Sequence, residues 1–344
     1  MRRAACTAVF AAAAVGAAAA AGIPTGAGSP ASPADAQDLP SEPARLAATS
    51  LLLDVVPAGH RLVAVGERGH ILISDETGRS WRQVGSPTQS LLTGVCFGDA
   101  QRGIAVGHDE VILSTQDAGE TWKRTHYAPQ AHRPLLDVWC GSGGRSIAVG
   151  AYGAYLVSED YGASWTEGKF AAASAGARGP GNVVVSADET GSDFHLNAIA
   201  ASGPRLYLAA EAGHLYRSDD GGRAWRELPS PYEGSLFGVL PISGDVLLAY
   251  GLRGNLFRSE DAGATWQRIA TGTDAMLDGA TLLEDGGIAV VGLSGVVLLS
   301  GDGGRTFALL QQDDRKGLAA VREVGSSLAV AGESGMRLIR EPHR

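Results

Sequence analysis

Six segments of the sequence place a carboxylate at the same point of the pattern S/T-x-D-x-G-x-x-W/F. The acid is Glu76 in the first copy; the others carry Asp117, Asp160, Asp220, Asp261 and Asp302. The closing aromatic residue is Phe307 in the last copy; the others carry Trp81, Trp122, Trp165, Trp225 and Trp266. A calcium-binding loop needs several oxygen ligands at alternate positions and a bidentate glutamate, whereas each copy offers a single recurring acid. We therefore predict structural turns, in which the acid accepts backbone hydrogen bonds and the aromatic ring packs between sheets.

The other residues suited to chemistry form no catalytic or metal-binding motif. The sequence contains no phosphate-binding loop and no HExxH, CxxC or GxSxG pattern. Cys96 and Cys140 occupy roughly equivalent places in consecutive repeats. We expect two buried thiols. The innermost strands of neighbouring repeats splay apart in a ring of blades, and a disulfide forms only over a narrow range of distances. In an oxidising compartment a disulfide is the alternative. We expect no cofactor and no metal ion.

The elements that must position these residues are repeats. Six segments superimpose without gaps, and they cover residues 62–81, 103–122, 146–165, 206–225, 247–266 and 288–307. A seventh, 328–340, stops before the acidic turn. Four of the five spacings between closing aromatics are 41 to 43 residues, and no segment shows helical periodicity. A period near 40 built from short strands and turns predicts a β-propeller.

Each repeat predicts four antiparallel strands. Between the second and third strands lies a tight turn with a glycine suited to positive φ, namely Gly69, Gly153, Gly213, Gly254, Gly295 or Gly335. The seventh repeat lacks a fourth strand. We expect residues 44–49 to supply it, so that pairing of N- and C-terminal strands closes the ring. The extra residues 170–194 predict a loop insertion.

The N-terminus has the composition of an export signal. Arg2 and Arg3 precede a small apolar run, and Ala34-Asp35-Ala36 offers a cleavage site. We therefore divide the chain into a signal peptide (1–36), a linker (37–43) and a single propeller (44–344). We expect a periplasmic or other extracytoplasmic location; an uncleaved signal acting as a membrane anchor is the alternative. The net charge of −9 argues against nucleic-acid binding.

The repeat pattern AVGxxG followed by S-x-D-x-G-x-x-W resembles the Asp-box turns of BNR-type repeats. The stretches 195–199, 231–238 and 250–259 extend this likeness, and residues 44–340 resemble the bacterial branch of the photosystem II stability/assembly factor family. The resemblance implies an all-β, seven-bladed propeller of four-stranded antiparallel blades with Asp-box turns. It also implies a scaffold outside the cytoplasm that assists membrane-protein assembly.

In Asp-box propellers the acidic turns lie on one face and binding usually occurs on the other. The glycine-containing turns and the loops between repeats lie on that second face, and from them we select Arg253, Tyr232, Arg68, Tyr152, Glu211 and His195 as partner-binding candidates. Arginine and tyrosine frequently anchor interfaces.

Two functional hypotheses follow. The first is a monomeric, non-enzymatic propeller that binds a membrane protein or membrane complex on its extracytoplasmic side. The alternative is an Asp-box glycoside hydrolase of the sialidase type, which requires three arginines, a tyrosine paired with a glutamate, and an acid. We prefer the first hypothesis, because only a few of the predicted blades place an arginine near the central channel of the propeller, where the three arginines of a sialidase would be needed.

Overall fold

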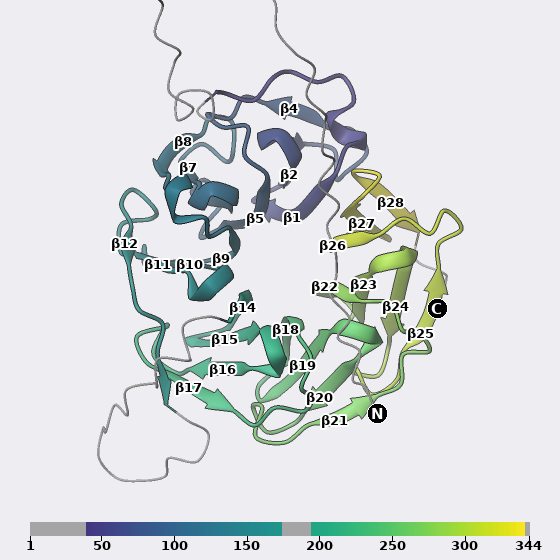
Figure 1. Ribbon diagram of the computed structural model, residues 1–344. Helices are drawn as coiled ribbons and strands as arrows, with labels where there is room; N and C mark the ends of the chain where they lie inside the picture. The colour runs from purple at the N-terminus through teal and green to yellow at the C-terminus, as the bar shows by residue number, and fades with distance from the viewer. Residues whose placement is uncertain (1–38, 174–193, 341–344) are drawn as a thin grey trace, which may run out of the picture. The chain divides into compact units, whose positions relative to one another are not determined.

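The computed structural model describes residues 39–173 and 194–340. The expected signal peptide lies outside these residues. Nearly all strands belong to seven antiparallel sheets that follow one another along the chain (Figure 1). No helix in residues 39–173 or 194–340 is long and apolar enough to cross a membrane. The predicted all-β propeller of seven blades is confirmed.

Within each blade the strands pair in chain order. Blades 1 and 2 contain β1 (Leu52–Ala58), β2 (Arg61–Gly66), β3 (Ile71–Ser74), β4 (Arg82–Val84), β5 (Leu92–Phe97), β6 (Gly103–Gly107), β7 (Ile112–Thr115) and β8 (Lys123–His126). Blades 3 and 4 contain β9 (Leu135–Cys140), β10 (Ser146–Gly150), β11 (Tyr155–Ser158), β12 (Thr166–Glu167), β14 (Leu196–Ser202), β15 (Arg205–Ala210), β16 (Leu215–Ser218) and β17 (Trp225–Leu228). Blades 5 to 7 contain β18 (Leu236–Ser243), β19 (Val246–Gly251), β20 (Leu256–Ser259), β21 (Gln267–Ile269), β22 (Leu277–Leu282), β23 (Ile288–Gly292), β24 (Val296–Ser300), β25 (Ala308–Gln311), β26 (Leu318–Val324), β27 (Ser327–Gly332) and β28 (Arg337–Arg340).

The first strand of each blade lies innermost and contacts the first strand of the next, and β26 contacts β1, so the blades form a closed ring. The second strands are almost wholly buried. Their alanine, glycine and valine residues suit the crowded centre of a propeller. The hydrophobic core consists of clusters shared by neighbouring blades, as where Leu52 of blade 1 groups with Ala329 of blade 7.

The closure of the ring differs from the expectation. Blade 7 has three strands among the described residues, and residues 47–49 form a short 3-10 turn, η1 (Ala47–Thr49), in place of a strand. The reason is that the chain enters along blade 1, where the Ala44 amide donates to Gln83 Oε1 at 2.8 Å. A single backbone bond, from the Met336 amide to the Ala48 carbonyl at 2.9 Å, joins η1 to blade 7.

The start of the predicted 170–194 loop insertion is packed rather than loop-like. Phe170 is buried and its ring lies 4.9 Å from that of Tyr216 and 5.8 Å from that of Trp225. After it, β13 (Ala172–Ala173) adds a parallel strand to the edge of β17. The remainder of the insertion, 174–193, lies outside the described residues.

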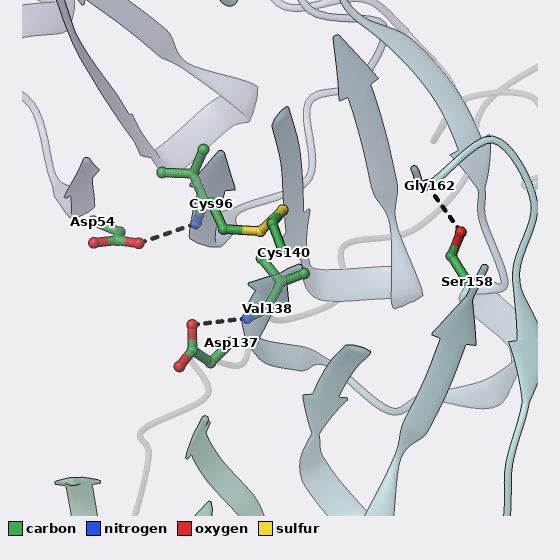
Figure 2. Close-up of a disulfide and its surroundings, with 8 residues drawn as sticks. Asp54, Cys96, Asp137, Val138, Cys140, Ser158 and Gly162 are labelled. Atoms are coloured by element: carbon green, nitrogen blue, oxygen red, sulfur yellow. Dashed lines mark hydrogen bonds between the residues drawn. A yellow bond between two sulfur atoms is a disulfide. The ribbon is translucent and has the colours of Figure 1, made fainter. Parts of the chain in front are cut away.

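The expectation of two free thiols is wrong, because Cys96 and Cys140 form a disulfide with a Cα–Cα distance of 5.7 Å. Cys96 is the second-to-last residue of β5, and Cys140 is the last residue of β9. Near the channel these two innermost strands run close enough to fall within the ordinary range for a disulfide (Figure 2).

Candidate functional site

The acidic turns use their aspartates internally. Asp160 accepts hydrogen bonds from the Ser164 amide at 2.9 Å and the Ser164 hydroxyl at 2.6 Å, and these bonds lower the pKa of Asp160 to about 2. The Gly162 amide donates to the Ser158 hydroxyl at 2.9 Å (Figure 2). Equivalent turn bonds are made by Asp117, Asp220, Asp261 and Asp302. The acids are therefore engaged within their own turns, which agrees with a structural role.

The tryptophans of these turns are tied down as well. The indoles of Trp81, Trp122 and Trp165 each donate to the carbonyl of the glycine three residues earlier. Those of the next two copies reach the preceding blade: Trp225 donates to the Tyr155 hydroxyl and Trp266 to the Pro229 carbonyl. Either arrangement holds the ring in place at a blade edge.

The turns between second and third strands share one backbone form. Six of them are single 3-10 turns: η2 (Glu67–Gly69), η3 (His108–Glu110), η5 (Ala151–Gly153), η7 (Glu211–Gly213), η8 (Leu252–Gly254) and η9 (Leu293–Gly295). In each, the middle residue is left-handed with φ between 53° and 59°. In five of the six the following glycine also has positive φ, as predicted, whereas in η3 Glu110 takes this place with φ of 48°. Three of the candidates, Arg68, Tyr152 and Arg253, occupy this middle position and are exposed.

Contacts join three of the predicted residues to one another. The rings of Tyr152 and His195 meet edge to face, with centroids 4.9 Å apart. The His195 amide donates to Glu211 Oε2 at 3.3 Å, and the Glu211 amide donates to the His195 carbonyl at 2.9 Å. Tyr152, His195 and Glu211 therefore form one surface across blades 3 and 4, which we call the Tyr152 surface.

A cavity of about 350 Å³ adjoins this surface, and Tyr152 and Arg133 both line it. Arg133 Nε lies 2.7 Å from Oε1 of the buried Glu110, and its Nη2 lies 2.8 Å from Oε1 of the exposed Glu167. The first pair fixes the guanidinium, while Glu167 faces water and is replaceable. Lys169 adds a second, exposed cation to the lining.

The remaining candidates do not take part in the contacts that join the Tyr152 surface, although the loop that carries Tyr232 runs beside η7. Tyr232 stacks on Phe257 with ring centroids 6.2 Å apart and packs against a core cluster, so it acts chiefly in packing. Arg253 is exposed on blade 5, and Arg68 is exposed on blade 1.

Sequence reasoning expected a central channel but selected none of the residues that line it; the innermost strands enclose a cavity of about 530 Å³ there. Polar side chains there connect consecutive blades. Asp54 accepts from the Val95 amide at 3.0 Å, and Asp137 accepts from the Ile199 amide at 2.9 Å. Figure 2 shows both carboxylates near the disulfide. The available signal was an acid inside an apolar inner strand, as in Leu-Leu-Asp at 52–54 and 135–137.

The cavity raises the pKa of its acids. Burial raises the pKa of Asp137 to about 7, with the nearby Asp54 adding to the effect, and burial alone raises the pKa of Asp278 to about 7. The side chain of Asp278 accepts no hydrogen bond within residues 39–173 and 194–340, whereas Asp137 accepts two. An ionised Asp278 therefore destabilises the folded ring.

Replacing Asp278 by asparagine is expected to stabilise the protein at pH 8 by about 2 kcal/mol, half the ceiling of about 4 kcal/mol set by the shift, since the cavity admits water. Between pH 4 and 7 the folded state binds a proton that the unfolded state has released, so wild-type stability falls as pH rises. The asparagine variant lacks this loss. Urea unfolding should therefore show no gain at pH 4 and the full gain above pH 7. An equal effect at both pH values would contradict the assignment.

The chain is similar to known proteins in part of its sequence and in its fold. Residues 73–226 match the family model described as photosynthesis system II assembly factor YCF48. The solved structure "YCF48 bound to D1 peptide" shares 16% identity at a TM-score of 0.65, over 88% of this chain and 97% of that chain. "YCF48 from Cyanidioschyzon merolae" also shares 16% identity at 0.65, over 86% and 97%.

The propeller fold is shared more widely. The WD40 β-propeller domain of Doa1 is 10% identical at a TM-score of 0.61, over 90% of this chain and 97% of that chain. A search of the curated proteins returns no match by sequence. The structural likenesses show the fold, and the family match confirms the resemblance to photosystem II assembly factors.

Proposed function

We propose that this chain is a non-enzymatic, exported propeller that binds a segment of a membrane protein and assists the assembly of its complex. The observation that carries the proposal is the Tyr152 surface with its adjoining cavity. There an exposed aromatic ring, a fixed guanidinium and an exposed lysine lie together.

Tyr152 has the properties of an interface anchor. Its side chain is 56% exposed, yet its backbone is held in the left-handed position of η5 and its ring rests against His195. A large side chain already held in place loses little conformational entropy on binding. Tyrosine and arginine are also enriched among the residues that dominate binding energy.

The cavity suits an extended acidic segment. Glu167 occupies one side of Arg133 from an exposed position, so a carboxylate of a partner can replace it at Nη2 without disturbing the buried pair with Glu110. The similar propeller described as bound to a D1 peptide supports peptide binding as a use of this fold.

Two features support a location outside the cytoplasm. The N-terminal run of Arg2, Arg3 and small apolar residues has the order of a signal peptide. The disulfide between Cys96 and Cys140 is of the kind that persists in oxidising compartments. We propose a monomer that does not bind nucleic acid, in keeping with the net charge of −9.

Replacing Tyr152 by alanine is expected to weaken partner capture at least about tenfold, the loss typical of an interface anchor. The matched control is Ser294→Ala, which changes an exposed residue at the same turn position of blade 6 and should leave capture intact. Alanine already occupies this position in η7 as Ala212, so the turn tolerates it.

The measurement is capture from detergent-solubilised membranes, quantified by mass spectrometry, with thermal unfolding of each variant as the folding control. If Tyr152→Ala and wild type retain the same partners, the proposed surface is wrong. Turnover of sialosides or β-glucans that is lost when a cavity carboxylate is replaced would instead support the glycoside hydrolase.

A further inference from the structure

The central cavity is lined by more acidic than basic side chains. Three carboxylates, Asp54, Asp137 and Asp278, line it together with a single guanidinium, that of Arg322. Arg322 Nη1 donates to the carbonyl of its neighbour Val321 at 2.7 Å, and no carboxylate of the described residues lies within ion-pair distance of it.

The three carboxylates have different roles. Asp54 accepts from the amides of Val55 and Val95, so both of its oxygens are occupied by backbone donors. Asp137 is occupied in the same way. Asp278 lines the same cavity and, in the part of the chain that the structure describes, accepts no such bond. Its carboxylate is the acceptor that remains available to a ligand.

Tyr250 independently indicates a ligand. It lies on the second strand β19, but its ring reaches the cavity because Gly238 of the inner strand has no side chain: a Cβ there would lie 2.2 Å from the Tyr250 hydroxyl oxygen. The residue is only 6% exposed. Nevertheless its hydroxyl faces the cavity without a hydrogen-bond partner among residues 39–173 and 194–340. The hydroxyl is open to the cavity, so a group that enters the cavity can form a hydrogen bond with it.

The lining restricts the chemistry of that ligand. No three acidic, histidine or cysteine side chains of the described residues gather closely enough to hold a metal ion. Apolar side chains such as Val56, Leu240 and Ala280 lie along the same wall as the acids. A cation with an aliphatic stem fits both features, because the stem covers apolar surface while the charged head reaches the carboxylate.

We propose that the central cavity binds an alkylammonium group, with the Asp278 carboxylate and the Tyr250 hydroxyl accepting its hydrogen bonds. The group comes either from a lysine side chain of a bound protein segment or from a free diamine. This site is separate from the Tyr152 surface, and the inference does not depend on the function proposed there.

The test is calorimetric titration of the purified chain at pH 7.5 with two probes, 1,5-diaminopentane and Nα-acetyl-lysine methylamide. Asp278→Asn is expected to weaken binding at least about tenfold and Tyr250→Phe at least about threefold, since a charged hydrogen bond contributes more than a neutral acceptor. Asp313→Asn, which removes an exposed acid away from the cavity, should bind as wild type does. Urea unfolding of each variant confirms that it is folded.

Preference for one probe identifies the source of the group: the diamine indicates a free ligand, and the lysine derivative indicates a protein side chain. Binding should also release protons, because an ammonium group favours ionised Asp278. This release appears as a dependence of the measured heat on the ionisation enthalpy of the buffer. Equal affinity of wild type and Asp278→Asn, no binding of either probe, or binding of acetate that is lost in Arg322→Gln would each overturn the proposal.

Discussion

Replacing Gly213 by alanine is expected to lower the free energy of unfolding by at least about 3 kcal/mol, which is large for a single methyl group. Gly213 ends η7 with φ of +80°, a conformation that L side chains rarely adopt. A Cβ there would lie 1.8 Å from the carbonyl oxygen of Tyr232, which is backbone and cannot rotate away. Either the loop that carries Tyr232 or the η7 turn itself, which also contains Glu211, must therefore move.

Gly203→Ala is the matched control for this prediction. Gly203 also has positive φ, at +60°, but nothing lies within 4 Å of the position a Cβ would take. This variant should lower the free energy of unfolding by only about 1 kcal/mol, the conformational cost of alanine at positive φ. The difference between the two variants in urea unfolding isolates the clash from the strain of the backbone. Similar losses would show that the contact with Tyr232 relaxes freely.

The fold could be predicted because its determinants recur within each repeat. Positive φ at the turn glycines and the bonds of the aspartate turns are local, so a pattern repeated six times reports them directly. Gly69, for example, has positive φ, and Asp160 accepts hydrogen bonds from Ser164 in its own turn. The positions of Tyr152 and Arg253 on exposed turns follow from the same local pattern.

Contacts between blades could not be predicted in this way. Asp54 bonds to Val95, 41 residues away in the next blade, and no spacing within one repeat reports such a pairing. Tyr232 was selected as an exposed anchor, but it is half-buried by stacking on Phe257, which lies in β20, after two intervening strands of the chain. The prediction that residues 44–49 complete blade 7 failed for a similar reason, since Gln83 of blade 1 binds the entering chain at Ala44.

Reduction of the disulfide between Cys96 and Cys140 is expected to lower the free energy of unfolding by about 3 to 4 kcal/mol. The two cysteines are separated by 44 residues, so the bond closes a long loop and removes many conformations from the unfolded chain. Urea unfolding with and without a dithiol reductant measures the loss. The double variant Cys96→Ala/Cys140→Ala should match the reduced protein and show no response to the reductant.

Reduction of the disulfide should leave the native ring assembled, because a second connection joins blades 2 and 3. The Thr93 hydroxyl donates to the Leu135 carbonyl at 2.8 Å across the same pair of inner strands, and this bond does not depend on sulfur. Removing both connections in a Thr93→Val chain under reductant should therefore destabilise the joint more than either change alone, with faster amide exchange in β5 and β9. If reduction leaves the unfolding midpoint unchanged, the cysteines are unpaired in solution and the support that the disulfide gives to an oxidising location is lost.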